Sequence, residues 1–234
     1  MTTSIAPIGV IRSCFEEKFG IPRQGGLVPG ARATLELNAP YDQDEAVRGL
    51  TDFSHAWVIF GFHGCPPNQW SPTVRPPRLG GNARLGVFAS RSPFRPNGLG
   101  LSVARIVAVE RRGGTLCVDL AGLDVMDGTP VYDLKPYLPY ADARSDATAP
   151  FDAPTQLEGP IRWSAEALEG RRTLECSHPE FGAVVEGILR CDPRPAYARD
   201  GDPARRYGVK VYGVDVGWTM NGDEIHVESV RIDP

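Results

Sequence analysis

The sequence predicts a mainly β protein, with a small barrel or sandwich first and a smaller α+β unit after it. Short segments rich in valine, isoleucine, leucine and aromatic residues are separated by turns drawn from 26 glycines and 22 prolines, a pattern typical of many short strands. Helical periodicity is missing from the first 145 residues, apart from a short turn around EAVRGL. The βαβ alternation of a Rossmann-type sheet is therefore absent.

Seven segments of the N-terminal part have strand character, and several alternate between apolar and polar residues. They are IAPIGVIRS, RATLELN, HAWVIFGFHG, ARLGVFAS, LSVARIVAVE, TLCVDLAGL and TPVYDLKPY. Gly113-Gly114 and Asp127-Gly128 fall between such segments, and we interpret both as hairpin turns.

The composition changes over residues 140–159, which are rich in alanine, proline and aspartate and have no periodicity. We interpret this stretch as a linker between an N-terminal domain, 1–145, and a C-terminal domain, 160–234. In the second domain, Ser177 and Glu180 resemble a capping box. The helix expected next has apolar residues at helical spacing and ends at Asp192-Pro193; these apolar residues are Phe181, Val184, Val185, Ile188 and Leu189. The final segment, YGVKVYGVDVGWTMNGDEIHVESVRID, predicts two strands around an Asn-Gly turn.

The charge of the chain is unevenly distributed. The net charge is −4, yet no Asp or Glu occurs from Phe53 to Val109, a stretch that contains six arginines. A polyanionic partner would therefore meet a local basic surface on a protein that is acidic overall.

Several classes of protein are disfavoured by the sequence. Five cysteines form no CxxC pair, and Cys176 with His178 lacks a second pair at ligand spacing, so we expect no disulfide framework and no metal. The longest apolar stretch, AWVIFGF, is too short to span a bilayer. The N-terminus MTTSIAPIG lacks the pattern of a signal peptide, so we expect a cytoplasmic protein with no membrane contact.

The segment RSPFRPNGLGLS, residues 91–102, is the strongest candidate for a binding site. Pro93 and Pro96 stiffen the loop, and the glycines allow close approach of a ligand to the backbone. Arg91 and Arg95 are presented on this support, where guanidinium groups suit a carboxylate or phosphate. The alternative is a turn with two solvated arginines; the absence of nearby acids favours binding.

Other rigid segments carry polar side chains. GIPRQGGLVPG places Arg23 and Gln24 between proline and glycine, and DPRPAY, 192–197, holds an aspartate, an arginine and a tyrosine after the expected helix. The alternative for DPRPAY is a proline-rich helix stop. Asp133, Lys135 and Tyr137 alternate and share one face of a strand, which is either a functional face or simply the solvent side. Asp127 is better explained as a turn residue.

These segments together, in this order, resemble the TsaA-like (TrmO) family of tRNA methyltransferases. The motifs are IGVIRS, KFGIPRQGGL, FSHAWVIFGFH, RPPRLGGNARLGVFASRSPFRPNGLGLS, GLDVMDGTPVYDLKPYLPY, DPRPAY and YGVKVYGVDVGW. One departure is Gly98, where proline is expected in many members. The resemblance implies an N-terminal β-barrel that binds S-adenosylmethionine, a C-terminal domain that helps to bind tRNA, and a homodimer. The implied reaction is methylation of N6 of threonylcarbamoyladenosine at position 37 of tRNA.

The resemblance also implies the residues of the site. Those expected to contact S-adenosylmethionine are Arg23, Gln24, Gly25, Gly26, Phe62, His63, Arg91, Leu101, Ala121, Gly122, Leu123 and Asp124. Those expected to contact tRNA are Arg75, Arg78, Arg95, Asn97, Arg194 and Tyr197. We expect Asp133 or Asp192 to be the base or to orient the amide, with Lys135 and Tyr137 arranging the nucleoside. Two alternatives stay open: a non-catalytic module that binds tRNA or S-adenosylmethionine, and a methyltransferase acting on another RNA or a small metabolite.

Overall fold

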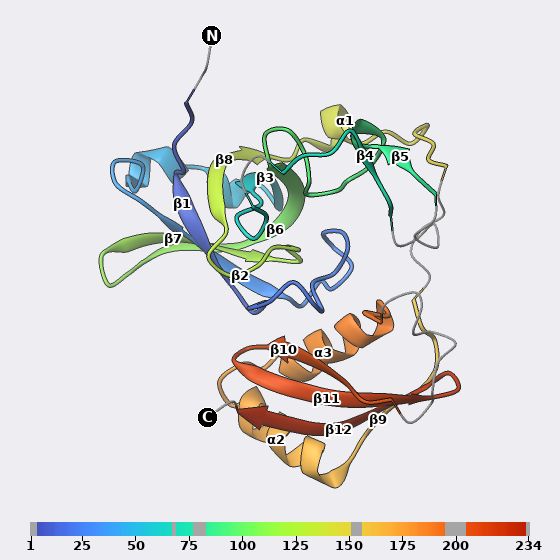
Figure 1. Cartoon of the computed structure of the whole chain (residues 1–234). Coiled ribbons are helices and arrows are strands. Elements are labelled where there is room, and N and C mark those ends of the chain that lie inside the picture. Colours follow the sequence, from blue (N-terminus) through green and yellow to red (C-terminus); the bar gives the residue numbers. More distant parts are fainter. Residues whose placement is uncertain (1–3, 67–68, 77–82, 151–155, 195–204, 233–234) are drawn as a thin grey trace.

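The computed structural model describes residues 4–66, 69–76, 83–150, 156–194 and 205–232. The described residues form two larger sheets of unequal size and one two-stranded sheet, and a group of loops lies between the two larger sheets (Figure 1). The expectation of a mainly β protein is confirmed.

The N-terminal sheet is a ring of six strands in which each strand pairs with two neighbours. Its order is β1-β2-β7-β6-β3-β8, and β8 returns to β1. All of its pairings are antiparallel, unlike those of a Rossmann-type sheet. The strands are β1 (Gly9–Ser13), β2 (Arg32–Leu37), β3 (His55–Gly61), β6 (Leu99–Arg112), β7 (Thr115–Ala121) and β8 (Pro130–Pro136).

Alternate residues of these strands fill the inside of the ring, as period-2 patterning requires. Ile11, Leu35, Val58, Leu120 and Val131 are all fully buried. The neighbours of Val58 on β3, Trp57 and Ile59, are only half-buried and belong to the outer face. The ring therefore has its own core, and functional side chains lie on its rim or its outside.

Two expectations for this region were wrong. Asp127-Gly128 is a turn but not a hairpin turn, because β7 and β8 are separated in the ring by β6 and β3. The segment ARLGVFAS is not a full strand: β5 (Leu85–Gly86) pairs only with β4 (Thr73–Val74), and a 3-10 turn, η4 (Val87–Ala89), follows. The turn near EAVRGL is present as η1 (Asp44–Val47), with a second turn, η2 (Leu50–Asp52), behind it.

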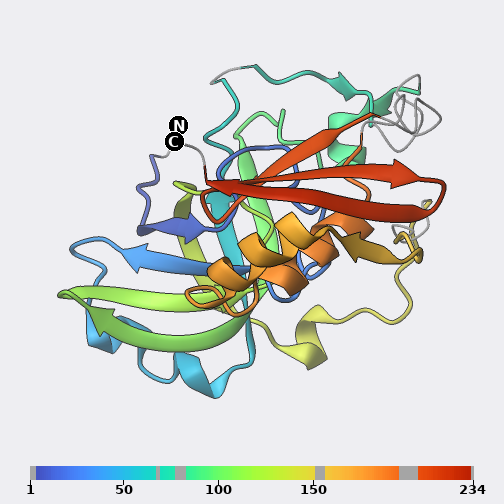
Figure 2. The same cartoon turned by 90° about the horizontal axis from the view of Figure 1, so that it is seen from below.

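The C-terminal sheet has four strands in the order β10-β11-β12-β9. Two helices pack against one of its faces (Figure 2). The expected Asn-Gly turn joins β11 to β12, but a second turn at Tyr212-Gly213 separates β10 from β11, so the region holds three strands and not two. The elements are β9 (Ile161–Trp163), α2 (Ala165–Glu175), α3 (Phe181–Arg190), β10 (Tyr207–Val211), β11 (Val214–Asn221) and β12 (Glu224–Ile232); a short helix, α1 (Pro139–Asp142), lies in the predicted linker.

Helix α3 confirms the apolar pattern but not the cap. Its five apolar positions at helical spacing are all buried. The capping box was wrong: Glu180 is the N-cap, but its side chain does not cap the helix, and the Ser177 hydroxyl donates to the carbonyl of Leu174. Helix α2 was not predicted; Ser164 caps it by accepting a hydrogen bond from the amide of Ala167 at 3.0 Å.

The loop after β1 and the C-terminal elements together form a hydrophobic core that joins the two sheets. Phe15, Val28 and Ala31, from the loop after β1, are buried together with α3 and the C-terminal strands. The amide of Tyr212 donates to the carbonyl of Cys14 at 3.0 Å. Gly20 has a φ of +90° and leaves no room for a side chain against Val209. The loop of residues 14–31 therefore docks the C-terminal sheet against the ring.

Candidate functional site

Four loops meet near one rim of the ring, where β1, β3, β6 and β7 begin or end. They comprise residues 14–31, 62–66, 91–98 and 122–129. The amide of Gly26 donates to the carbonyl of Gly122 at 2.8 Å, and the amide of Gly122 donates to the carbonyl of Ala31 at 2.9 Å. The amide of Phe62 donates to the carbonyl of Gly98 at 2.8 Å. Backbone hydrogen bonds thus fix these loops to one another.

Asp124 is the main acidic group of this loop cluster. Its Oδ1 accepts a hydrogen bond of 2.6 Å from the hydroxyl of Ser102, which points inward from β6 and is 5% exposed. Burial raises the pKa of the Asp124 carboxyl above its ordinary value, although hydrogen bonds from Ser102 and the amide of Gly25 and the charge of Arg91 oppose the shift. A carboxylate in this setting can accept hydrogen bonds from a ligand.

The glycines of the cluster keep the space beside Asp124 open. A Cβ added to Gly25 would lie 3.2 Å from the carbonyl oxygen of Val103 and 3.3 Å from Asp124 Oδ1, which is tighter than ordinary contact. Gly26 and Gly122 have φ values of +81° and +76°, where side chains are strained. The predicted cofactor residues from 23–26 and 121–124 are therefore brought together, as a narrow backbone-lined site.

The two arginines of RSPFRPNGLGLS partly hold their own loop in place. Arg91 donates to the carbonyl of Leu101 at 3.2 Å, which places it beside Ser102. Arg95 donates through Nη1 to the carbonyls of Val87 and Ser90, at 3.3 and 2.8 Å. Neither forms an ion pair with a residue that the structure describes. Arg95 therefore has no carboxylate partner among the described residues, while Arg91 lies near enough to Asp124 for their charges to interact.

A cavity of about 390 Å³ lies next to this cluster. Phe62 and His63, both predicted cofactor residues, share its lining with Arg95 and Asn97, both predicted tRNA residues. Tyr132 from β8 completes one wall, because Gly61 leaves it room. The structure thus places these four residues around one cavity.

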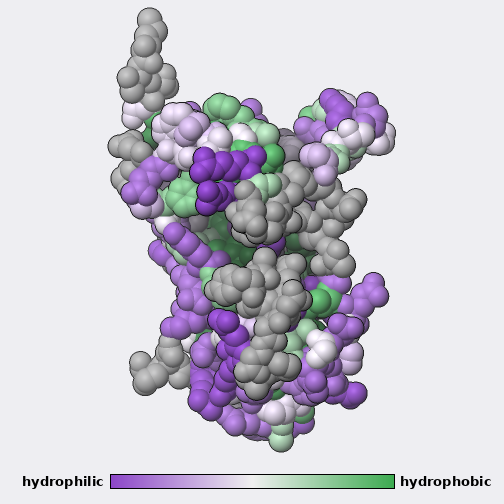
Figure 3. Space-filling view, turned by 45° about the vertical axis from the view of Figure 1, so that its right-hand side comes forward, coloured by the Kyte–Doolittle hydropathy of each residue, from purple (hydrophilic) through white to green (hydrophobic). Residues whose placement is uncertain are grey.

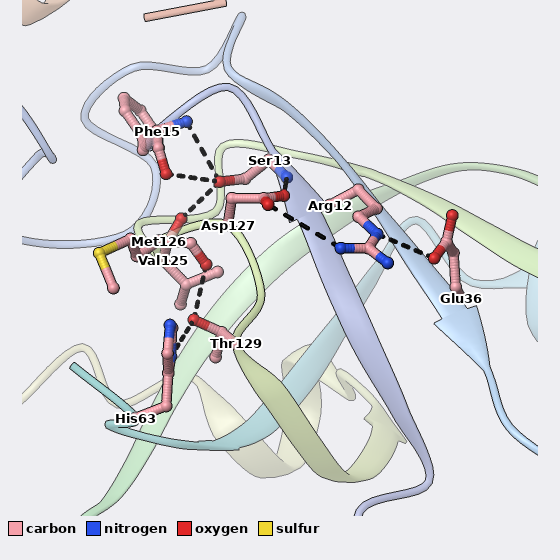
Figure 4. A network of polar contacts seen from close by, with 9 residues as sticks. All are labelled: Arg12, Ser13, Phe15, Glu36, His63, Val125, Met126, Asp127 and Thr129. Carbon is pink, nitrogen blue, oxygen red and sulfur yellow. Dashed lines mark hydrogen bonds and ion pairs between the residues drawn. The ribbon is translucent and has the colours of Figure 1, made fainter. Parts of the chain in front are cut away.

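The turn after Asp124 is held by a network of polar contacts (Figure 4). Asp127 Oδ1 accepts from the amide of Ser13 at 3.0 Å, and its Oδ2 lies 3.9 Å from Arg12. This agrees with the interpretation of Asp127 as a turn residue. The hydroxyl of Thr129 lies 3.3 Å from Nδ1 of His63 and 2.6 Å from the carbonyl oxygen of Met126.

Asp133, Lys135 and Tyr137 lie on the outer face of the ring, as their alternation predicts. Asp133 is opposite Ile59 and Lys135 is opposite Trp57 in the pairing of β8 with β3. The ring of Tyr137 packs 5.7 Å from that of Trp57. Leu101, a predicted cofactor residue, is opposite Ile59 on the other side, so it shares this face with Asp133.

Asp192 and Arg194 form a buried ion pair in the C-terminal part. Arg194 donates to both carboxylate oxygens of Asp192, at 2.7 and 3.2 Å, and the two side chains are 9% and 10% exposed. Asp192 has a φ of +47°, which is uncommon outside glycine and frequent at functional sites. Arg23 is close enough to Cys191 to lower the pKa of that thiol against the larger effect of burial. The DPRPAY segment therefore begins beside the loop of residues 23–26.

Several residues of the carboxylate-free stretch are exposed, and part of the stretch lines the cavity. Five arginines of this stretch form no ion pair within the described residues: Arg75, Arg84, Arg91, Arg95 and Arg105. Arginines elsewhere do form ion pairs, such as Arg111 with Asp44 at 2.9 Å. Exposed aromatic side chains of the same stretch include Trp70 at 51%, Phe88 at 77% and Phe94 at 42%. Figure 3 shows that the molecule is hollowed between its N-terminal and C-terminal parts, with apolar side chains inside the hollow. Arg78 and Tyr197 lie outside the described residues.

Sequence reasoning missed three residues of this region. Ser102 is the one polar residue on the inward side of LSVARI, and that break in an apolar pattern was a usable signal. Thr129 and Tyr132 carried no comparable signal, because their roles depend on contacts with His63 and Gly61 from a distant strand. Among the residues with described positions, no group of histidine, cysteine and acidic side chains could hold a metal ion. No helix within that part of the chain has the length and apolar character to cross a membrane.

The protein is mainly β, and its candidate site lies near the rim of the antiparallel six-stranded ring. Glycines line this site around the carboxylate of Asp124. Arginines without ion pairs among the described residues and exposed aromatic side chains border it. The model of the tRNA-methyltransferase O N-terminal domain matches residues 10–143, and that of the TrmO C-terminal domain matches residues 155–233. The chain belongs to the TrmO family, which confirms the resemblance seen in the sequence.

Individual relatives agree with this assignment. A tRNA (adenine(37)-N6)-methyltransferase of Escherichia coli is 46% identical, with 91% of each chain covered. A Pseudomonas aeruginosa protein, provisionally named the S-adenosylmethionine-dependent methyltransferase RcsF, is 50% identical over 93% of each chain. A crystal structure of TrmO from Pseudomonas aeruginosa is 41% identical, with a TM-score of 0.81, and the match covers 100% of this chain and 98% of that one.

Proposed function

We propose that this protein is an S-adenosylmethionine-dependent tRNA methyltransferase that methylates N6 of threonylcarbamoyladenosine at position 37. The observation that carries the proposal is that a possible cofactor site and a possible tRNA surface lie next to each other. The glycine-lined site around Asp124 lies beside a cavity and a basic, aromatic surface, in a chain similar over nearly its whole length to a tRNA (adenine(37)-N6)-methyltransferase.

The residues near the rim fit S-adenosylmethionine. When bound, this cofactor supplies an electrophilic methyl group on a sulfonium. The space that a Cβ on Gly25 would fill allows a ligand to approach the backbone, and Asp124 could accept from a ribose hydroxyl or an ammonium group. Arg91, which forms no ion pair among the described residues, could hold the carboxylate of the methionine part. Gln24, Gly26, the carbonyl of Leu101 and the backbone of 121–123 would complete this site.

We propose that tRNA lies against the carboxylate-free surface. Arg75, Arg95 and Asn97, together with Arg78, would contact phosphates. Binding of arginines to phosphates is favourable because it releases the counterions condensed on the nucleic acid. Phe88, Phe94 and Trp70 would stack on unpaired bases of the anticodon loop, as exposed aromatic rings do in single-strand recognition. This assignment adds the three aromatic residues to the arginines that the sequence predicted.

The two candidate aspartates would have different roles. Both oxygens of Asp192 accept hydrogen bonds from Arg194, so we assign this pair, with Tyr197, to positioning the modified nucleoside. Asp133 Oδ1 accepts from the amide of Leu134 at 2.9 Å, and its second oxygen could orient the threonylcarbamoyl amide. Lys135 and Tyr137 on the same face would assist in holding that group.

Two further features belong to the proposal. We infer that the six-stranded ring acts as a barrel-type methyltransferase domain, 1–145, with the C-terminal domain, 160–234, completing the tRNA site. We infer a homodimer formed through the outer face of β3 and β6, where Leu101 is 46% exposed and lies opposite Ile59. Because the substrate is tRNA, we place the enzyme in the cytoplasm.

The test uses purified protein, S-adenosylmethionine labelled in its methyl group, and tRNA from a strain that lacks this gene. We expect label in threonylcarbamoyl-modified tRNA and none in tRNA without that group. Absence of label from both would support a non-catalytic binding module. Equal labelling of both tRNAs would show that the acceptor is a different nucleoside.

A further inference from the structure

A hydrogen-bond chain fixes the tautomer of His63. The hydroxyl of Thr129 lies 2.6 Å from the carbonyl oxygen of Met126, which can only accept, so the hydroxyl proton points there. The same hydroxyl lies 3.3 Å from Nδ1 of His63. Because its single proton is already donated, the hydroxyl accepts from His63, and Nδ1 must carry a proton (Figure 4).

This chain rests on a rigid support. Thr129 is only 3% exposed, and its amide also donates to the carbonyl of Met126, at 3.3 Å. The turn is tied to the loop after β1, since the amide of Asp127 donates to the carbonyl of Phe15 at 2.7 Å. The orientation of the imidazole is therefore set by two separate parts of the chain.

The other nitrogen, Nε2, forms no hydrogen bond with any residue that the structure describes. In the neutral ring it holds the free lone pair, because the proton is on Nδ1. His63 is exposed and lines the cavity of about 390 Å³. Gly128 has no side chain to cover it: a Cβ built there would come no closer than 3.8 Å to Nε2. A proton acceptor is thus presented at the cavity.

The charged and titratable groups around His63 come from five segments of the chain. Lys18 donates to the carbonyl of Gly64, next to His63, and Cys65 follows in the same loop. The carboxylate of Asp127 points toward Ser13 and Arg12, and so away from the imidazole of His63. Tyr132 and Arg95 line the cavity.

We propose that His63 is the catalytic base of the reaction, with Thr129 as its positioning residue. This inference rests on the proposed function. As N6 is methylated, its N–H bond breaks and the electron pair forms the new N–C bond, while the pair of the S–CH₃ bond stays on sulfur. The proton moves to Nε2 of His63, and the imidazolium then loses it to water.

Each aspartate of the site accepts at least one hydrogen bond within the protein, and Asp133 accepts its bond from the amide of Leu134. Asp124 is bound to Ser102, Asp127 to Ser13, and Asp192 to Arg194 through both oxygens. Of these, Asp192 has both oxygens held by Arg194, whereas Nε2 of His63 lines the cavity and accepts no hydrogen bond from any described residue. This is why we assign the proton to His63 and the aspartates to positioning.

The experiment compares His63→Asn and His63→Gln with the wild type under single-turnover conditions at saturating tRNA and S-adenosylmethionine. Asparagine can keep a donor near the position of Nδ1 but has no atom at Nε2, so we expect its rate to fall about 100-fold or more, the usual contribution of general base catalysis. We expect the wild-type rate to rise with pH as an imidazole loses its proton, and the variants to lose this rise. Affinities for tRNA and cofactor, measured separately, should change much less than the rate.

A second readout does not depend on activity. In nitrogen NMR spectra of the free protein, Nε2 of His63 should appear unprotonated and Nδ1 protonated, and Thr129→Val should abolish this preference. A fall in rate of less than about tenfold in His63→Asn, or a protonated Nε2 in the neutral wild type, would overturn the proposal. Failure of the proposed function would look different, because the wild type itself would then transfer no methyl group, while the NMR result would be unaffected.

Discussion

The hydroxyl of Ser102 donates a hydrogen bond of 2.6 Å to Asp124 at the rim of the ring. Ser102 comes from the inward side of β6, and Asp124 comes from the loop after β7, so the contact joins a wall of the ring to the loop cluster. The bond stabilises the charged carboxylate but does not cancel the effect of its burial, which raises the pKa of Asp124. The protein therefore keeps, at the proposed ligand site, a carboxylate whose charged form is disfavoured by burial.

Replacing Asp124 by asparagine should change how stability depends on pH. A carboxyl whose pKa is higher in the folded than in the unfolded state binds its proton more tightly when folded, so its contribution to stability is lost as pH rises through that range. The free energy of unfolding of the wild type, relative to Asp124→Asn, should thus increase as pH falls from about 7 toward about 4. Denaturant titrations at several pH values would measure it, and a constant difference would contradict the expectation. Affinity for S-adenosylmethionine should fall in the same variant.

Phe88→Ala should weaken tRNA binding without changing the fold. The ring is 77% exposed and lies 6.0 Å from the guanidinium of Arg95. Base stacking on an aromatic ring contributes about 1–3 kcal/mol per base, and we expect a loss of that size. Filter binding at fixed salt would measure it. Tyr41→Ala is the matched control, since Tyr41 is 41% exposed but lies outside the carboxylate-free stretch; equal losses in both variants would refute a specific surface.

Tyr212→Phe should destabilise the junction between the two sheets. The phenol donates to Glu180 at 2.7 Å, and burial, the largest effect, raises the pKa of Tyr212, so it remains a donor at neutral pH. Loss of a hydrogen bond to a charged group costs about 1.5–3 kcal/mol. Thermal or urea unfolding would measure this against Tyr140→Phe, whose ring is 84% exposed and should have no effect. Unchanged stability in Tyr212→Phe would show that the contact contributes little.

The cysteines should differ sharply in reactivity. Cys14 is 4% exposed, and burial raises the pKa of its thiol to about 12, while Cys176 is exposed. Because the thiolate is the reactive form, a thiol reagent should modify Cys176 in the native protein and Cys14 only after unfolding. Mass spectrometry of digested samples would identify the modified residue, and Cys176→Ser should remove that fast modification. Rapid labelling of Cys14 in the folded protein would argue against the buried junction.

Leu101→Glu should weaken the homodimer that we propose. Leu101 lies opposite Ile59 on the outer face of the ring, and a charge there would have to lose its water on association. Sedimentation velocity should show a shift to monomer at concentrations where the wild type is dimeric. Val107→Glu, at a site 40% exposed further along the same strand, serves as control. A monomeric wild type would refute the dimer itself.

Patterns within single segments were enough to predict several parts of the fold. The buried face of α3 and the shared face of Asp133 and Lys135 follow from helical and strand periodicity alone. Interpretations that needed a partner segment were less secure. Ser177 looked like a cap, but the last turn of α2 takes its hydroxyl. Asp127-Gly128 looked like a hairpin turn, but the strands on either side pair elsewhere.

The candidate site shows the same division. The motif RSPFRPNGLGLS and the stretch without carboxylates predicted which residues to consider, because composition and spacing are properties of the chain itself. The contact of Ser102 with Asp124 and that of Thr129 with His63 join residues 22 and 66 positions apart. No local pattern encodes such contacts.

By itself, the sequence determined the mainly β character, the family and the location of the basic stretch, because these depend on residue type and order along the chain. Only the tertiary structure decided which polar groups already have partners and which remain available, as with Asp192 held by Arg194 and His63 with a free Nε2. The physical reason is that a hydrogen bond depends on the distance and direction between two groups in space, and folding sets both.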